Sequence, residues 1–322
     1  MRKKTLPFFL FLVGLVFISS NASAAWTQAK GHSYNQMTLS HYKTVKKFTT
    51  LHYDSNQLGG TIDGLDAPAH IIPSEEFTST KVSYYGEYGL TDKITGIISG
   101  GWDWQKTNDA MKYSDDDGPS GVGDIILGLR HKLSDNLGAG VLSSLQVDLK
   151  IPDAYDYGDP ILEQSLGDGQ YDATGKLLFG RGFNWGYTVL SAGYKYRFEN
   201  DKNGNMTFKP SDQMLLGISG GYNAFPWLSI RGNLDYNKPV GNAEVSDELI
   251  AYYGSISGYD WHKDVVLIKD TLGLEAESLS GGIALAFTVK PGMQVVVSTD
   301  RTLYGKDASI GTTYSLAVAM SL

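Results

Sequence analysis

The chain has 322 residues, of which 42% are apolar and none is Cys, and it carries a formal net charge of −8. Without a thiol it can form neither a disulfide-stapled scaffold nor a Cys-ligated zinc or iron–sulfur site. Excess negative charge also argues against nucleic acid as a partner, because it repels phosphate. Aromatic residues make up 12% of the chain and charged residues only 19%, which argues against intrinsic disorder.

Residues 1–24 have the features of a signal peptide. A basic start at residues 2–4 is followed by an apolar run from Leu6 to Ile18, and Ala22-Ser23-Ala24 matches a small-x-small cleavage site. The sequence therefore predicts export, with a mature chain over residues 25–322. A retained membrane anchor is the alternative, but the apolar run is short for a span.

The rest of the chain alternates apolar and polar residues, a pattern typical of strands with two different faces. The last segment shows it well: Ile310, Thr312, Tyr314, Leu316 and Val318 alternate with small or polar residues. No stretch after residue 25 approaches the roughly 20 apolar residues of a transmembrane helix. The period therefore predicts an all-β chain.

About twelve such segments can be counted along the chain. They fall near residues 31–43, 77–89, 94–106, 122–133, 138–150, 171–180, 185–198, 213–223, 228–237, 275–289, 293–303 and 309–322. Their connections alternate between tight turns and long loops, at 44–76, 107–121, 151–170, 199–212 and 238–274, with a short sixth connection at 304–308. This alternation is typical of a transmembrane antiparallel up-and-down β-barrel with periplasmic turns and external loops.

Such a sheet must close in a membrane, because lipid offers no hydrogen bonds to a free strand edge. The sequence therefore predicts a barrel of the bacterial outer membrane. Its expected partners are outer-membrane lipid and lipopolysaccharide, a small-molecule solute, and the barrel-assembly machinery during insertion. A secreted β-sandwich is the alternative, although its strands are shorter and its loops are not sorted by length.

Several short glycine-containing segments carry a resemblance to a known family. They are Gly-Leu-Thr-Asp-Lys at 89–93, Gly-Val-Gly-Asp at 121–124, Ser-Leu-Gly-Asp-Gly-Gln-Tyr-Asp at 165–172 and Ala-Gly-Tyr-Lys-Tyr-Arg-Phe at 192–198. These segments resemble the meta-pathway phenol-degradation outer-membrane proteins, within the fatty-acid-transporter-like barrels. The start at residues 25–31 is also similar to XagA-like proteins. The resemblance implies passage of small hydrophobic or aromatic compounds, although too few residues precede the first strand for the N-terminal hatch of the fatty-acid transporters.

Catalytic and metal-binding patterns are weak. Ser219 lies in a G-x-S-x-G pattern, but a strand continues after it where a nucleophile elbow requires a helix. We therefore expect Ser219 to be a small lumen-facing residue and the protein not to be an enzyme. The acidic run Asp115, Asp116 and Asp117 is a weak candidate for a hard cation in a loop, and solvated loop charge is the simpler interpretation. No catalytic residue, metal site or cofactor is predicted.

The inward face of the barrel should hold the functional side chains. Phasing the strands by their apolar side predicts six lumen residues that could contact a solute: Arg231, Lys195, Arg197, Asp235, Arg130 and Lys176. In a barrel of about twelve strands the interior is narrower than that of a 16-stranded porin. We expect most of the inward charges to pair, because an unpaired charge in a confined space is costly.

Two functions remain open. The chain is either a porin-like channel for diffusion of small, hydrophobic or aromatic solutes, or a surface platform whose loops 44–76 and 238–274 mediate adhesion or partner binding. The loop at 238–274 is rich in Tyr and aliphatic residues. Such a loop would either plug the lumen, extend strands above the membrane or contact a partner, and we expect one of the first two.

Overall fold

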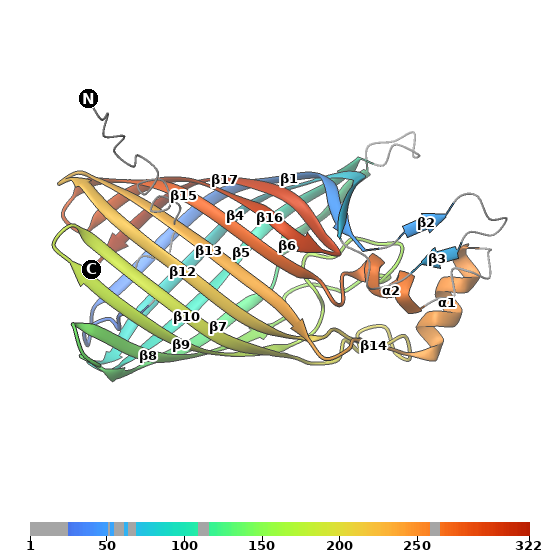
Figure 1. Ribbon diagram of the computed structural model, residues 1–322, viewed down its shortest axis with the longest axis horizontal. Coiled ribbons are helices and arrows are strands. Elements are labelled where there is room, and N and C mark those ends of the chain that lie inside the picture. The colour runs from blue at the N-terminus through green and yellow to red at the C-terminus, as the bar shows by residue number, and fades with distance from the viewer. Residues whose placement is uncertain (1–24, 51, 55–60, 64–68, 109–115, 258–264) are drawn as a thin grey trace, which may run out of the picture.

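The computed structural model describes residues 25–50, 52–54, 61–63, 69–108, 116–257 and 265–322. Most of these residues form the wall of a single barrel (Figure 1). The wall strands are β1 (Ser33–Thr49), β4 (His70–Thr91), β5 (Ile94–Asn108), β6 (Asp116–Val122), β7 (Ile125–Ser134), β8 (Val141–Ile151), β9 (Asp172–Phe183), β10 (Gly186–Arg197), β12 (Asp212–Phe225), β13 (Leu228–Val240), β15 (Glu277–Lys290), β16 (Met293–Lys306) and β17 (Ala308–Ser321).

The sheet closes on itself, and all of its pairings are antiparallel. β1 pairs with β4 on one side and with β17 on the other, where Leu39 lies opposite Leu316. β6 and β7 both pair with β5 and share one position in the wall, so the thirteen strands of the sheet form twelve positions. The predicted up-and-down barrel is therefore confirmed, because the pairing of β1 with both β4 and β17 closes the described wall.

The two faces of the wall differ as the alternation predicts. Leu129, Val147 and Leu190 point outward and are 54%, 52% and 52% exposed on the isolated chain, where lipid would cover them. Inward residues such as Arg130 and Ser144 are buried. An apolar outer band around a polar interior is the pattern of a membrane barrel, because the outer face meets hydrocarbon.

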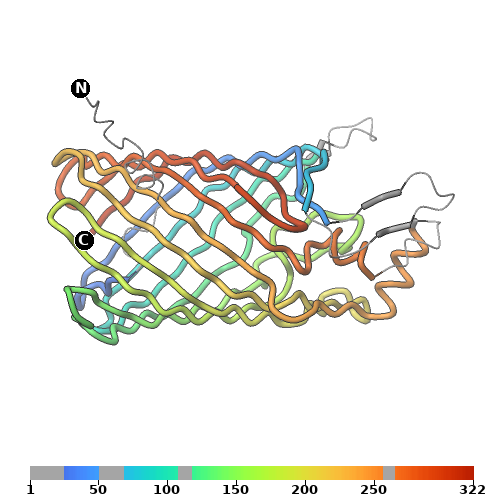
Figure 2. Tube along the Cα trace, viewed as in Figure 1, coloured from blue at the N-terminus to red at the C-terminus, as the bar shows by residue number. Residues whose placement is uncertain are grey.

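The two ends of the barrel carry different connections. Tight turns at one end join β4 to β5, β9 to β10, β12 to β13 and β15 to β16, and the C-terminus lies at this end (Figure 2). Long connections extend from the other end and hold two small antiparallel pairs, β2 (His52–Asp54) with β3 (Thr61–Asp63), and β11 (Phe208–Lys209) with β14 (Glu244–Val245) of a different loop. By the rule for outer-membrane barrels, the turns are periplasmic and the long loops external.

The loop after β13 forms two helices, α1 (Asp247–Ser257) and α2 (Val265–Leu272), beyond the strand ends (Figure 1). Ser246 caps α1, because its Oγ accepts a hydrogen bond from the amide of Leu249 at 3.3 Å. Gly273 ends α2 with a φ of +61°, which favours glycine. The described part of this loop therefore neither plugs the lumen nor extends the strands (Figure 1), and the expectation is wrong for these residues. Neither helix is long and apolar enough to cross a membrane, within the residues described.

Candidate functional site

The residues before β1 enter the lumen from the periplasmic end. Ala25 is fully buried, and its carbonyl accepts a hydrogen bond from Ser144 Oγ at 3.0 Å. The carbonyl of Trp26 accepts one from Arg130 Nη1 at 2.9 Å. The Trp26 ring meets Tyr187 of β10 edge to face, with 6.1 Å between ring centroids. Residues 25–30, called the N-terminal segment below, therefore lie against the inner wall.

Gln28 fixes the middle of the N-terminal segment. Its backbone amide donates to Thr95 Oγ1 at 2.8 Å, and its side-chain amide donates to Glu87 Oε2 at 2.7 Å. The amide of Lys30 then donates to Asp92 at the periplasmic turn after β4, at 3.1 Å. The N-terminal segment thus runs from the turn into the barrel, where side chains of β4, β5, β7 and β8 hold it.

Two glycines give the N-terminal segment room. A Cβ built on Gly180 would lie 2.5 Å from the Ala25 Cβ, and one built on Gly89 would lie 2.0 Å from the Ala29 carbonyl oxygen. Both distances are shorter than real contacts, so any larger residue at these positions must displace the segment or the wall. The barrel is therefore shaped around the segment at these points.

A buried ion pair links the N-terminal segment to the wall. Arg130 Nη1 lies 2.9 Å from Glu87 Oε1, and the two side chains are only 2% and 1% exposed. The Tyr85 hydroxyl also donates to Glu87, at 2.5 Å, and Arg130 Nε donates to Gln146 at 2.9 Å. Arg130 therefore holds the wall and the segment together, and its charge is compensated inside the barrel.

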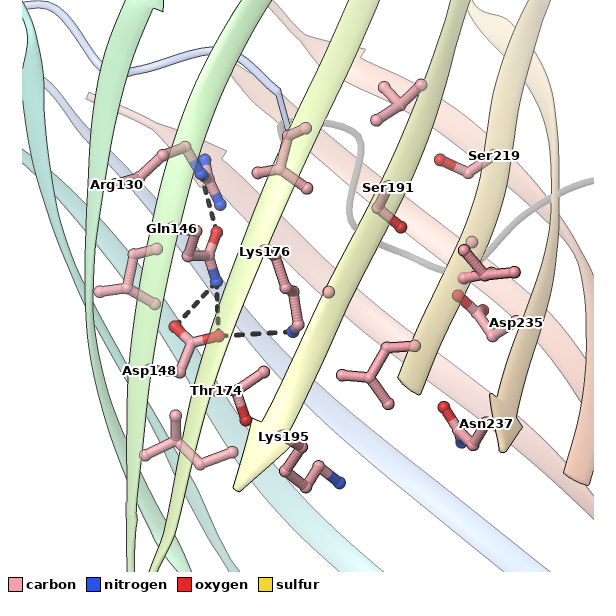
Figure 3. A pocket seen from close by; sticks show the side chains of 18 of the residues that line it. Arg130, Gln146, Asp148, Thr174, Lys176, Ser191, Lys195, Ser219, Asp235 and Asn237 are labelled. Atoms are coloured by element: carbon pink, nitrogen blue, oxygen red, sulfur yellow. Dashed lines mark hydrogen bonds and ion pairs between the residues drawn. The ribbon is translucent and has the colours of Figure 1, made fainter. Parts of the chain in front are cut away.

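A cavity of about 490 Å³ lies in the lumen, and it is lined by charged and hydroxyl side chains together with apolar ones such as Leu178 and Val189 (Figure 3). We call it the outer cavity. Asp148 accepts hydrogen bonds from Gln146 and lies 3.4 Å from Lys176 Nζ. Lys195 and Asp235 also line the cavity, from β10 and β13. Side chains of both charge signs therefore face one cavity, as the phasing of the strands predicts.

The external end of the outer cavity is held by a charged network. Lys150 Nζ lies 2.9 Å from both Asp168 and Asp172, and Arg197 lies 3.2 Å from Asp168 and 3.6 Å from Asp172. Asp168 belongs to the loop between β8 and β9. Desolvation acts to raise the pKa of Asp168, but Lys150 and Arg197 outweigh it and hold that pKa below its usual range. The network fixes this loop at the external mouth.

A second cavity of about 440 Å³, called the periplasmic cavity below, includes Gln28, Tyr34, Tyr187, Arg231 and Gln294 in its lining. Gln28 belongs to the N-terminal segment. Arg130, which holds that segment, lines the outer cavity. The segment thus lines the periplasmic cavity and is hydrogen-bonded to a residue that lines the outer one.

The external loops form a small core of their own, outside the strands. Leu249 of α1 and Ile268 of α2 are fully buried with Phe208 of β11. The helix α2 is tied to the barrel rim, because Lys47 of β1 lies 2.5 Å from Asp270. Leu249 and Ile268 are therefore buried against neighbouring loops, which explains how a loop with these apolar residues can lie on the external side.

The structure separates the six predicted lumen residues into three places. Arg130, Lys176, Lys195 and Asp235 line the outer cavity, Arg231 lines the periplasmic cavity, and Arg197 joins the network at the external mouth. Ser219 also lines the outer cavity, as expected for a small inward residue (Figure 3). Sequence reasoning missed the N-terminal segment, because nothing in residues 25–30 alone specifies a place in the lumen.

The weak cation candidates lie at the boundary of the described residues. Asp115 lies outside the described residues, and of Asp116 and Asp117 only the backbone in β6 is described. In the described part of the chain, no group of three or more His, Asp or Glu side chains is placed to hold a metal ion.

Comparison with solved structures agrees with the barrel geometry. The chain is similar to an outer-membrane channel of the COG4313 group from Pseudomonas putida F1, with 14% identity, a TM-score of 0.66, and coverage of 93% of this chain and 98% of the other. It also matches a FadL homologue of Pseudomonas aeruginosa (11% identity, TM-score 0.42, 89% and 90% coverage) and the toluene transporter TodX of P. putida (10%, 0.41, 92% and 91%). The last two overlap too loosely to support an argument.

No protein family and no curated protein matches the sequence. The closed wall, its apolar outer band and the shared fold of the COG4313 channel together define an outer-membrane β-barrel. Its location is the bacterial outer membrane.

Proposed function

We propose that the barrel is a channel for small solutes, in which the N-terminal segment forms the restriction. The observation that carries this proposal is the placement of residues 25–30 in a lumen that holds one cavity of about 490 Å³ and another of about 440 Å³. A barrel built only as an anchor could fill this space with side chains. Here the interior keeps cavities in which inward charges lie beside apolar side chains, which favours passage.

The N-terminal segment is held weakly compared with the wall. Four hydrogen bonds join Ala25, Trp26 and Gln28 to side chains of the wall. Each such bond contributes about 0.5–1.5 kcal/mol net, and somewhat more where a partner is charged. A continuous backbone ladder instead joins every wall strand to its neighbours. Displacement of the segment therefore costs far less than opening the wall, so it is the element that regulates the path.

The nature of the solute is part of the proposal. The similar COG4313 protein is described as an outer-membrane channel, and the resemblance to the meta-pathway phenol-degradation proteins favours small hydrophobic or aromatic compounds. We also propose that residues 1–24 are removed on export, which would make Ala25 the first residue of the N-terminal segment.

A pair of glycines on β9 offers a test with a matched control. Gly180→Val places carbon where the Ala25 Cβ lies, whereas Gly182, two residues on along the same inward face, has no atom within 4 Å of its built Cβ. In planar bilayers, we expect Gly180→Val to raise single-channel conductance and Gly182→Val to leave it unchanged. Equal conductance of both variants and the unmodified protein would refute a restriction by the segment.

The external core favours a second function, a surface platform. Its fully buried Leu249 and Ile268 give the loops a fixed shape beyond the barrel, which adhesion or partner binding would require. Replacing α1 and α2 by a short linker should abolish binding of cells to a host surface or polysaccharide if this function holds. Unchanged binding would leave the channel as the function of the barrel.

A further inference from the structure

The periplasmic cavity contains a buried cation with no anion beside it. Arg231 lies on the inward face of β13 and is 5% exposed. Its Nη2 donates to Gln294 of β16, whereas Nε and Nη1 have no hydrogen-bond partner among the described residues. No described carboxylate forms an ion pair with Arg231, although Arg130 in the same lumen is paired with Glu87.

This difference between the two arginines points to a ligand. Burying a guanidinium group without a counter-charge is unfavourable, because the group loses its hydration and gains nothing in return. Water could satisfy the two free nitrogens but could not compensate the charge. A bound anion would do both, since hydrogen bonds between a guanidinium and a carboxylate are among the stronger ones in proteins.

The surroundings of Arg231 indicate what kind of anion fits. Tyr34 of β1 and Tyr187 of β10 line the cavity together with Met293. The Tyr34 hydroxyl already donates to Gln36 at 2.7 Å. These side chains offer ring and thioether surface to the body of a molecule, and a volume of about 440 Å³ is that of a small-molecule site. A small carboxylate with an apolar body matches this lining better than a fully hydrated inorganic ion.

We propose that the periplasmic cavity binds the carboxylate of a small organic acid, with Arg231 pairing the carboxylate and Tyr34 and Tyr187 contacting the apolar body. The inference deepens the proposed function, on which it rests, because it names the charge of a solute that reaches the lumen from the periplasmic side. Gln28 of the N-terminal segment also lines this cavity, so a bound acid lies directly against the restriction.

Binding to the purified full-length barrel in detergent tests the proposal. Benzoate is titrated by calorimetry, with benzamide as a neutral molecule of the same shape and with inorganic phosphate. We expect benzoate to bind, and benzamide and phosphate to bind about tenfold or more weakly, because they lack the charge or the apolar body. Equal binding of benzoate and benzamide would overturn the proposal, as would absence of binding or phosphate binding more tightly than benzoate.

Two variants locate the site. Arg231→Gln should weaken benzoate binding about tenfold or more, whereas Lys202→Gln, which removes a cation from an external loop outside both cavities, should leave it unchanged. Equal loss in both variants would overturn the assignment to Arg231. The comparison of benzoate with benzamide needs no variant, so it decides the matter even if Arg231→Gln does not fold. Because binding is measured without conductance, a failure here leaves the channel proposal standing, and a failure of conductance leaves this one standing.

Discussion

Replacing Arg130 tests the buried ion pair that joins the wall to the N-terminal segment. Arg130→Met removes the hydrogen bonds to Gln146 and Trp26 and leaves the Glu87 carboxylate buried. Removing one partner of a buried ion pair costs about 3–5 kcal/mol of unfolding free energy. Glu87 keeps its bonds from Tyr85 and Gln28, so we expect the lower end of this range.

The double variant Arg130→Met/Glu87→Gln separates the charge from the lost contacts. It removes the uncompensated carboxylate. The remaining loss is mainly that of the hydrogen bonds from Arg130 to Gln146 and to the Trp26 carbonyl, which contribute about 1 kcal/mol each to stability. We therefore expect the double variant to be about 1–2 kcal/mol more stable than Arg130→Met alone. Urea unfolding in phospholipid vesicles, followed by Trp fluorescence, measures the free energies. If both variants lose the same stability, Glu87 is not held as a buried charge and the reasoning fails.

Three further predictions follow from the wall, the loops and the charged network. Leu234→Arg, at the middle of the lipid-facing side of β13, should cost about 2–4 kcal/mol of unfolding free energy and Ile230→Arg, near the periplasmic end, about 1 kcal/mol or less; equal costs would contradict the assigned depth. Replacing residues 246–273 by a short linker should leave single-channel conductance unchanged, because the restriction lies inside the barrel, and a clear increase would move it to the external loops. The lowered pKa of Asp168 means that its contribution is present above the unfolded pKa of about 3.9 and is lost only as the pH falls through the lower folded value. The hydrogen-exchange protection factors of residues 152–171, which correct for the pH dependence of the intrinsic exchange rate, should therefore stay constant from pH 7 to about pH 5, and Asp168→Asn should lower them over that range.

The wall could be predicted from the sequence because its physics is local. Each strand must present an apolar residue to lipid at every second position, so β17, with Tyr314 and Leu316 outward, shows the period directly. The side chains between the outward ones must point into the lumen. This is why Arg130, Lys176, Lys195 and Asp235 reach one cavity. Which charges pair depends on neighbours far apart in sequence, such as Glu87 and Arg130.

The helices of the external loop carry local sequence signals that differ from the alternation of the strands. Ser246 followed by Asp247 and Glu248 is a helix start, and Gly273 is a common helix end. The N-terminal segment is different in kind. Nothing in residues 25–30 specifies a lumen site until Gly180 and Gly89 are known to face them across the barrel, so this feature required the closed structure.

The most direct test of the central claim is to lock the N-terminal segment in place. The chain has no native Cys, and the built Cβ of Gly180 lies 2.5 Å from that of Ala25, so a small shift brings the pair Ala25→Cys and Gly180→Cys to the roughly 3.8 Å that a disulfide needs. With the crosslink verified by mass spectrometry, we expect the oxidised protein to show no channel openings in planar bilayers and reduction to restore them. Equal conductance before and after reduction would show that solutes pass without movement of the segment and would contradict the account.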